Sequence, residues 1–173
     1  LADKYNLSDE YIEKITMFSP LHDIGKVGIP DSILLKAGQL TDNEFETMKS
    51  HTIVGREKID RLLKNFGFEG FQYAEVLRNI AEYHHEAING SGYPNGLEGN
   101  EIPLEARIVA VADIFDALTS QRPYKEAWSN ERAFDMLKKL VGSKLDEDCV
   151  RVLMDNLAEI ESIQQQFSED PLG

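Results

Sequence analysis

The 173-residue sequence holds one cysteine, Cys149, and no apolar run near the roughly 18 residues of a membrane-spanning helix. A single thiol forms neither an internal disulfide nor a thiolate metal site, so we expect a reducing, cytoplasmic location and no membrane partner. The N-terminus lacks the basic region and apolar stretch of a signal peptide. Because it begins with Leu1 rather than methionine, we expect a fragment or a processed chain.

Positive charge is scarce as well. The sequence has 18 Lys and Arg against 31 Asp and Glu, a formal net charge of −13. This balance argues against a binder of nucleic acid polymers, which needs a basic face. An anionic substrate would be repelled unless its site carries concentrated positive charge, which bound divalent metals can supply.

Strand-like alternation is also rare, so the fold class predicted is all-α. Thr41 and Glu44 form a capping box, with Leu40 and Phe45 at the hydrophobic-staple positions. Ser8 is a candidate N-cap, and Pro20 is expected to kink the first helix. Apolar spacing and caps predict helices over 8–24, 41–63, 72–86, from Pro103 onward, 130–141 and 147–166, with a helical turn in 27–40.

The length fits one domain, predicted over 1–163, with a polar, frayed tail at 164–173. Residues 87–102 are rich in glycine and predict an extended loop, which at this length is usually functional or disordered. The following helix is apolar on most sides and should be the buried, central one. Asp113 interrupts that helix, and a buried carboxylate is costly unless it is paired or bound to metal.

The four histidines give the strongest chemical signal. A lone histidine is usually a surface or satisfied core residue, but each of these lies near a carboxylate or another histidine. Imidazole and carboxylate ligands suit first-row divalent metals such as Fe, Mn, Ni or Zn. They fall on three helices and one helix end, which a bundle can bring together. These residues are His22, His51, His84 and His85.

Helix geometry leaves the ligand roles open. His84 and His85 lie about 100° apart around a helix axis, so they should not easily aim at one point. They would then serve two metals, or act as one ligand and one substrate contact. Asp113 could bridge two metals, as Asp23 could, or form a salt bridge with Arg107 or Lys26. Glu86 is expected to support the ligands or to be solvated.

The ordered motifs resemble the HD-GYP domains, a branch of the HD phosphohydrolase superfamily. The resemblance covers about residues 1–160. HD alone is a weak motif, whereas the whole ordered set is specific. The matching segments are Leu21-His22-Asp23-Ile24-Gly25-Lys26, His51 with Gly55, His84-His85-Glu86, Gly90-Ser91-Gly92-Tyr93-Pro94, Ile102–Ile108, Asp113–Thr119 and Arg122-Pro123-Tyr124-Lys125.

The resemblance implies a helical bundle with a long glycine-rich GYP loop between helices. It implies a metal-dependent phosphodiesterase of bacterial signalling that hydrolyses cyclic di-GMP to pGpG or GMP. Two or three divalent ions are expected, Fe or Mn favoured over Ni or Zn. The ligands it implies are His22, Asp23, His51, His84, His85 and Asp113; Lys26 and Asp23 are the catalytic positions, and Gly92, Tyr93, Pro94, Asp116, Arg122 and Lys125 the substrate-binding ones.

Three departures from the family pattern bear on activity. The family has a further helix upstream that contributes a metal ligand, and we expect the sequence to begin after that helix. Ala87-Ile88-Asn89 stands where Arg-Trp-Asp is common, and Leu145-Asp146-Glu147 where Phe-Asp-Pro is common. The family arrangement also implies a sensory or receiver domain upstream in the parent protein.

Two other functions fit the same residues. The domain could be an HD hydrolase for a mononucleotide or another cyclic dinucleotide, although the Gly-Tyr-Pro loop disfavours a mononucleotide. It could instead be a metal-bearing module that binds the dinucleotide, or a protein partner through the loop around Tyr93, without catalysis. Arg122 and Lys125 could simply be a solvated pair at a helix end.

Overall fold

The structure, a computed structural model, describes residues 5–121 and 126–168. Within these ranges it is helical, with isolated β-bridges in place of strands, so the all-α prediction is confirmed. The elements are α2 (Asp9–Phe18), η1 (Ser19–Leu21), η2 (Ile24–Gly28), α3 (Asp31–Leu34), α4 (Asp42–Lys49), α5 (His51–Asn65), α6 (Ala74–Tyr83), η3 (Gly99–Glu101), α7 (Leu104–Thr119), α8 (Asn130–Leu140), α9 (Glu147–Asp155) and α10 (Leu157–Ser168).

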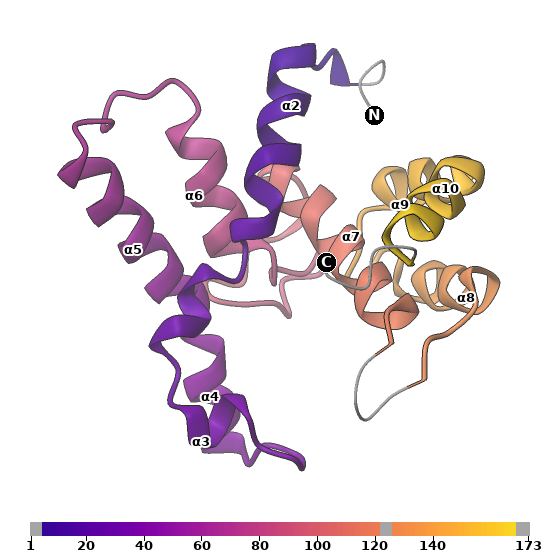
Figure 1. The fold of residues 1–173 in the computed structure, drawn as a ribbon, viewed down its shortest axis with the longest axis horizontal. Coiled ribbons are helices and arrows are strands. Elements are labelled where there is room, and N and C mark those ends of the chain that lie inside the picture. Colours follow the sequence, from indigo (N-terminus) through magenta and orange to yellow (C-terminus); the bar gives the residue numbers. More distant parts are fainter. Residues whose placement is uncertain (1–4, 122–125, 169–173) are drawn as a thin grey trace.

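Helix α7 lies at the centre of the arrangement in Figure 1, between the α2–α5–α6 group and the α8–α9–α10 group. Short helices α3 and α4 extend away from the end of α5. Val109 of α7 packs into one hydrophobic cluster, whereas Ala110 and Val111 pack into the other. The prediction that the helix after Pro103 is the central, buried one is therefore confirmed.

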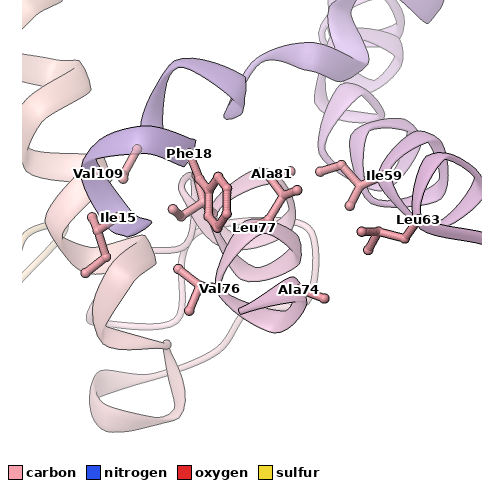
Figure 2. Close-up of a cluster of buried hydrophobic side chains, with 10 residues drawn as sticks. Ile15, Phe18, Ile59, Leu63, Ala74, Val76, Leu77, Ala81 and Val109 are labelled. Carbon is pink, nitrogen blue, oxygen red and sulfur yellow. The ribbon is translucent and has the colours of Figure 1, made fainter. Parts of the chain in front are cut away.

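The first cluster fixes the helices that carry the histidines. Figure 2 shows Phe18 of α2 beside Leu77 of α6, with Ile59 and Leu63 of α5 on the other side. The predicted apolar face of α6 is buried at Val76, Leu77, Ile80 and Ala81, and half-buried at Tyr73. Burying each of the larger aliphatic side chains, Val76, Leu77 and Ile80, contributes on the order of 1.5–3 kcal/mol.

A buried carboxylate adds a polar link between three helices. Glu105 of α7 is 5% exposed and accepts hydrogen bonds from the Tyr11 hydroxyl (2.7 Å) and from Asn79 Nδ2 (2.8 Å). Tyr11 belongs to α2 and Asn79 to α6. Because a buried carboxylate needs such partners, Glu105 fixes the position of α2 against both helices.

Helix 8–24 was predicted too long. Helix α2 ends at Phe18, and Pro20 lies in the first turn of η1, where its missing N–H is tolerated. Two 3₁₀ turns then carry the segment that contains His22 and Asp23. The capping box of Thr41 and Glu44 is confirmed.

The single helices predicted over 41–63 and 147–166 are each divided in the structure. Where α4 meets α5, the Ser50 hydroxyl donates to the Thr47 carbonyl (2.6 Å). Where α9 meets α10, Asn156 Nδ2 donates to the Val152 carbonyl (2.7 Å), and side chains of this kind compete with the helical ladder. Helix α10 continues to Ser168, past the start predicted for the tail.

Across the described ranges, no helix has both the length and the apolar character that crossing a bilayer would require.

Candidate metal centre

A close backbone crossing places the His-Asp turn against α5. A Cβ added to Gly25 would lie 1.8 Å from the His51 carbonyl oxygen and 2.5 Å from the Gly55 nitrogen. Only glycine therefore lets η2 approach α5 this closely. The contact brings Asp23, at the start of η2, beside His51, the first residue of α5.

Four donor side chains converge from three segments. Asp23, His51, His84 and His85 each offer a ligand atom, and these atoms all lie within 4.8 Å of one another. Asp23 Oδ1 is 3.4 Å from His51 Nε2 and 3.8 Å from His84 Nε2. The structure thus gathers, at the end of a helical bundle, four of the six ligands that the family resemblance implies.

Backbone carbonyls orient three imidazole rings. Nδ1 of His22, His51 and His84 lies 2.7, 2.7 and 2.9 Å from the carbonyl oxygens of Ser19, Met48 and Ile80. Since a carbonyl can only accept, each Nδ1 carries the proton and donates it. In the neutral ring Nε2 is then an acceptor, as in metal-binding histidines whose other nitrogen is hydrogen-bonded to the protein.

Burial keeps the inner rings neutral. It lowers the pKa of His84 to about 2 and that of His85 to about 4, and the neighbouring histidines add to the effect. Burial also lowers the pKa of His51. Burial alone would raise the pKa of Asp23, but its hydrogen bonds with His22 and Lys26 lower it, so the carboxyl group stays ionised.

The acceptors that meet at this point lack donors. Nε2 of His51 and Nε2 of His84 are 3.4 Å apart, and neither carries a proton in the tautomer that the carbonyls impose. Asp23 Oδ1 is buried and has no hydrogen-bond partner. Acceptors that face one another in this way need a cation between them, and imidazole with carboxylate suits a first-row divalent metal.

His22 and Asp113 lie beside this cluster. His22 Nε2 is 3.3 Å from Asp23 Oδ2 and 3.7 Å from Asp113 Oδ1. Burial opposes protonation of His22, but the hydrogen bond to Asp23 and the nearby carboxylates raise its pKa. Arg107 and Lys26 were the suggested salt-bridge partners of Asp113. In the structure Arg107 pairs instead with Asp146 (2.7 Å), and Lys26 pairs with Asp23 (Nζ to Oδ2, 2.5 Å).

The expectation that His84 and His85 should not easily aim at one point is not met. It assumed a regular helix through both residues, but α6 ends at Tyr83 and His84 is its C-cap. Beyond the cap the chain turns, and the two ring centroids lie 4.1 Å apart. Both residues therefore offer an atom to the same donor cluster.

The glycine-rich loop folds back over the cluster. The Tyr93 N–H donates to the His85 carbonyl (3.1 Å), and a Cβ on Gly92 would lie 2.3 Å from the Ala87 nitrogen. Glu86 is 5% exposed and accepts from the N–H groups of Asn95 (2.7 Å) and Leu97 (3.1 Å). Glu86 is therefore not solvated: it supports the loop beside the two histidines.

A cavity of about 420 Å³ opens above His84, His85 and Asp113. The Tyr93 ring borders it, 4.9 Å from the His85 ring, and a cis peptide bond joins Tyr93 to Pro94. Aromatic and polar groups around such a hollow are typical of small-molecule sites. Gly92 lines the same cavity, whereas Pro94, the third loop position expected to bind substrate, does not line it.

The remaining predicted substrate positions lie elsewhere or outside the described residues. Asp116 accepts a hydrogen bond from the Ser120 hydroxyl (2.8 Å) and lines a second hollow, of about 1060 Å³, with Trp128. Arg122 and Lys125 fall outside the described residues. Their roles stay predictions.

Sequence reasoning missed several residues of the first cavity. Lys49 and Lys144 line it, as does Phe45, which the sequence had suggested only as a helix staple. Phe45 and Lys49 lie four residues apart on α4, one turn before His51, and that spacing was the available signal. Lys144 is distant in sequence and gave none.

Comparison with known proteins agrees with this geometry. A family model for the HD domain matches residues 1–149. The chain belongs to the HD-domain family. The family resemblance inferred from the HD and Gly-Tyr-Pro motifs is confirmed, and the His/Asp cluster of this HD domain is one that could hold metal.

Curated relatives cover nearly the whole HD domain. The chain is 48% identical, over 97% of its length, to the "Cyclic di-GMP phosphodiesterase response regulator RpfG" of Xanthomonas campestris pv. campestris, covering 43% of that protein. In Vibrio cholerae it is 42% identical to a "Probable cyclic di-GMP phosphodiesterase" and 39% identical to the "3'3'-cGAMP-specific phosphodiesterase 2", over 98% of this chain and 38% and 31% of those proteins. The chain thus spans less than half the length of these relatives.

Proposed function

We propose that this HD domain is a metal-dependent phosphodiesterase that hydrolyses cyclic di-GMP to pGpG or GMP. The observation that carries the proposal is a set of hydrogen-bond acceptors on Asp23, His51 and His84 that have no donor. They lie beside a cavity large enough for a small-molecule ligand. The names of the relatives support a cyclic dinucleotide as the substrate.

Two or three divalent cations, Fe or Mn before Ni or Zn, would be held by His22, Asp23, His51, His84, His85 and Asp113. When bound, such ions polarise a phosphoryl oxygen and generate a nucleophile from water near neutral pH. The protein's part is to present neutral Nε2 atoms and an ionised Asp23, which the carbonyl contacts and the Lys26 ion pair maintain.

Other side chains would handle the phosphate and the base. Lys26, held by Asp23 at the edge of the cluster, would neutralise charge that develops on the phosphate. The Tyr93 ring, tilted by 35° to His85 at the cavity wall, would stack on guanine. Pro94, Gly92, Asp116, Arg122 and Lys125 are proposed to complete the substrate site.

A reconstitution assay tests the proposal. Metal-stripped protein would be loaded anaerobically with Fe(II) or Mn(II) and given cyclic di-GMP or 3'3'-cGAMP, with the double variant His84→Ala, His85→Ala as control. We expect pGpG or GMP only from the loaded wild-type protein. Bound metal and retained dinucleotide without product would instead indicate a binding module, and turnover of 3'3'-cGAMP alone would change the substrate.

The parent protein is proposed to couple this domain to a receiver domain. One relative is named a response regulator, and this chain covers only 43% of that protein. Phosphorylation-dependent activity of the longer protein would be the measurement that supports this arrangement.

A further inference from the structure

Two lysines with no role in the proposed chemistry line the cavity above the His/Asp cluster. Lys49 lies in the last turn of α4, and Lys144 lies in the turn between α8 and α9. They approach the cavity from elements that are far apart in the sequence. In a chain with 18 basic and 31 acidic residues, two cations at one hollow form a local concentration of positive charge.

Lys49 is held at the cavity wall by aromatic rings. Its Nζ lies 5.5 Å from the centre of the Phe45 ring and 5.7 Å from that of Tyr93. Its ion pair with Glu46 (2.6 Å) involves a carboxylate side chain that is 68% exposed. Exposed pairs of this kind contribute about 0–1 kcal/mol, so the ammonium can exchange Glu46 for a ligand at little cost.

Lys144 is fixed by its backbone rather than by its side chain. Its N–H donates to the Leu140 carbonyl (2.9 Å), and its carbonyl accepts from the N–H of Ile88 (3.2 Å), at the start of the glycine-rich loop. Among the described residues its ammonium has no ion-pair partner within 4 Å. The backbone therefore holds Lys144 beside the loop while its charge stays available.

The acidic residues of the cavity do not neutralise these lysines. Both oxygens of Glu86 are engaged by backbone N–H groups, and Asp113 lies 3.7 Å from His22 at the cluster. The cavity is thus lined both by His84 and His85 of the cluster and by the two lysines. A ligand that matches this lining carries one anionic group for the cluster and a second for the lysines.

We infer that Lys49 and Lys144 bind the phosphodiester of a cyclic dinucleotide that is not being cleaved, and so select substrates with two phosphates. The inference rests on the proposed function: one phosphate must lie at the cluster to be hydrolysed, which leaves the other for the lysines. Ammonium groups bind phosphate as point charges through short, charge-assisted hydrogen bonds. These lysines are then specificity-determining residues of the site.

The test compares substrates with two phosphodiesters and with one. Lys49→Gln and Lys144→Gln would each raise KM for cyclic di-GMP about tenfold, the loss of one charge-assisted hydrogen bond, with kcat unchanged. Hydrolysis of bis(p-nitrophenyl) phosphate, which has one phosphodiester, would not change. Lys139→Gln on the exposed side of α8 makes the same charge change away from the cavity and should alter neither substrate. Lys49→Arg and Lys144→Arg should retain a low KM.

Equal losses on both substrates, or no loss on cyclic di-GMP, would overturn the inference. Calorimetric binding of cyclic di-GMP to the metal-loaded protein separates it from the proposed function. If the wild-type protein binds the dinucleotide without cleaving it, the hydrolase proposal fails while weaker binding by the lysine variants still supports their role. If the wild-type protein does not bind cyclic di-GMP, the lysine inference fails as well.

Discussion

Nε2 of His51 faces Nε2 of His84 at 3.4 Å, and each ring donates its Nδ1–H to a backbone carbonyl. Two acceptors at this separation repel each other unless a cation lies between them. Burial lowers the pKa of both rings and so keeps them neutral, and a third acceptor beside them, Asp23 Oδ1, has no hydrogen-bond donor. The cluster is arranged for a positive ion.

The first prediction concerns the charge of Asp23. Asp23→Asn keeps the shape of the side chain but removes the anion and can turn an N–H toward the imidazole Nε2 atoms. Loss of a residue that only hydrogen-bonds to a metal ligand lowers metal affinity roughly 10–100-fold. Loss of the Asp23 ligand itself should lower it by more, and turnover should be lost. Metal content after dialysis measures the effect. Asp155→Asn, an exposed position at the end of α9, is the matched control, and equal metal content in both variants would contradict the assignment.

The second prediction is a pH dependence of the metal-free protein. The pKa values of His84 and His85 are lowered to about 2 and about 4, below the unfolded value of 6.5. Between pH 6.5 and 4 the unfolded chain therefore binds more protons than the folded chain. As the pH is lowered, the free energy of unfolding decreases by about 1.4 kcal/mol per pH unit for each histidine. The raised pKa of His22 opposes this only near and above pH 6.5, since its stabilisation is present below pH 6.5 and is lost as pH rises through its folded pKa.

Urea denaturation at several pH values between 7 and 4 measures this slope. His85→Asn removes one group with a lowered pKa, so its unfolding free energy should change less over the same interval. A variant with the same slope as the wild-type protein would show that His85 is accessible to protons in the folded state.

The third prediction tests the close crossing at Gly25. Gly25→Ala places a Cβ 1.8 Å from the His51 carbonyl oxygen, so η2 must move away from α5. We expect a loss of unfolding free energy of at least about 1–3 kcal/mol, the usual cost of overpacking, and weaker metal binding because Asp23 moves with η2. Gly38→Ala is the control, since nothing lies within 4 Å of its added Cβ. Similar stability in both variants would refute the crossing.

The fourth prediction concerns the support of the glycine-rich loop. Glu86→Gln replaces one of the two oxygens that accept from Asn95 and Leu97 with a donor, which leaves a backbone N–H unpaired. The cost should be about 1–3 kcal/mol in unfolding free energy, with faster hydrogen exchange at residues 95–97. Glu69→Gln, in the exposed turn before α6, should change neither measurement. Unchanged exchange in Glu86→Gln would show that the loop is held by other contacts.

The sequence was informative where the signal is local. The capping box of Thr41 and Glu44, the apolar face of α6 and the central place of α7 all follow from periodicity and caps. The convergence of His51, His84 and Asp23 also followed, because few histidines are present and a helical bundle can bring them together. Local patterns therefore predicted the fold class and the core of the candidate site.

Contacts between distant segments could not be read in the same way. Ser50 and Asn156 lie at the breaks between helices, where their side chains donate to carbonyls, and helix propensity alone does not place such breaks. Lys144 reaches the cavity only because its turn pairs with the start of the glycine-rich loop at Ile88. The role of Glu86 depends on the loop bringing residues 95–97 back to its carboxylate, and the sequence alone does not predict this contact.

Backbone carbonyls fix the histidine rings, and this makes the site comparable to a preorganised chelator in coordination chemistry. An open-chain chelator loses conformational freedom when it wraps a metal, whereas a macrocycle has lost it beforehand. Met48 and Ile80 hold the rings of His51 and His84 in the folded chain before any ion arrives, so the site resembles the macrocycle. Binding free energy is then not consumed in arranging donors, and exchange of one metal for another need not disturb the helices that carry them.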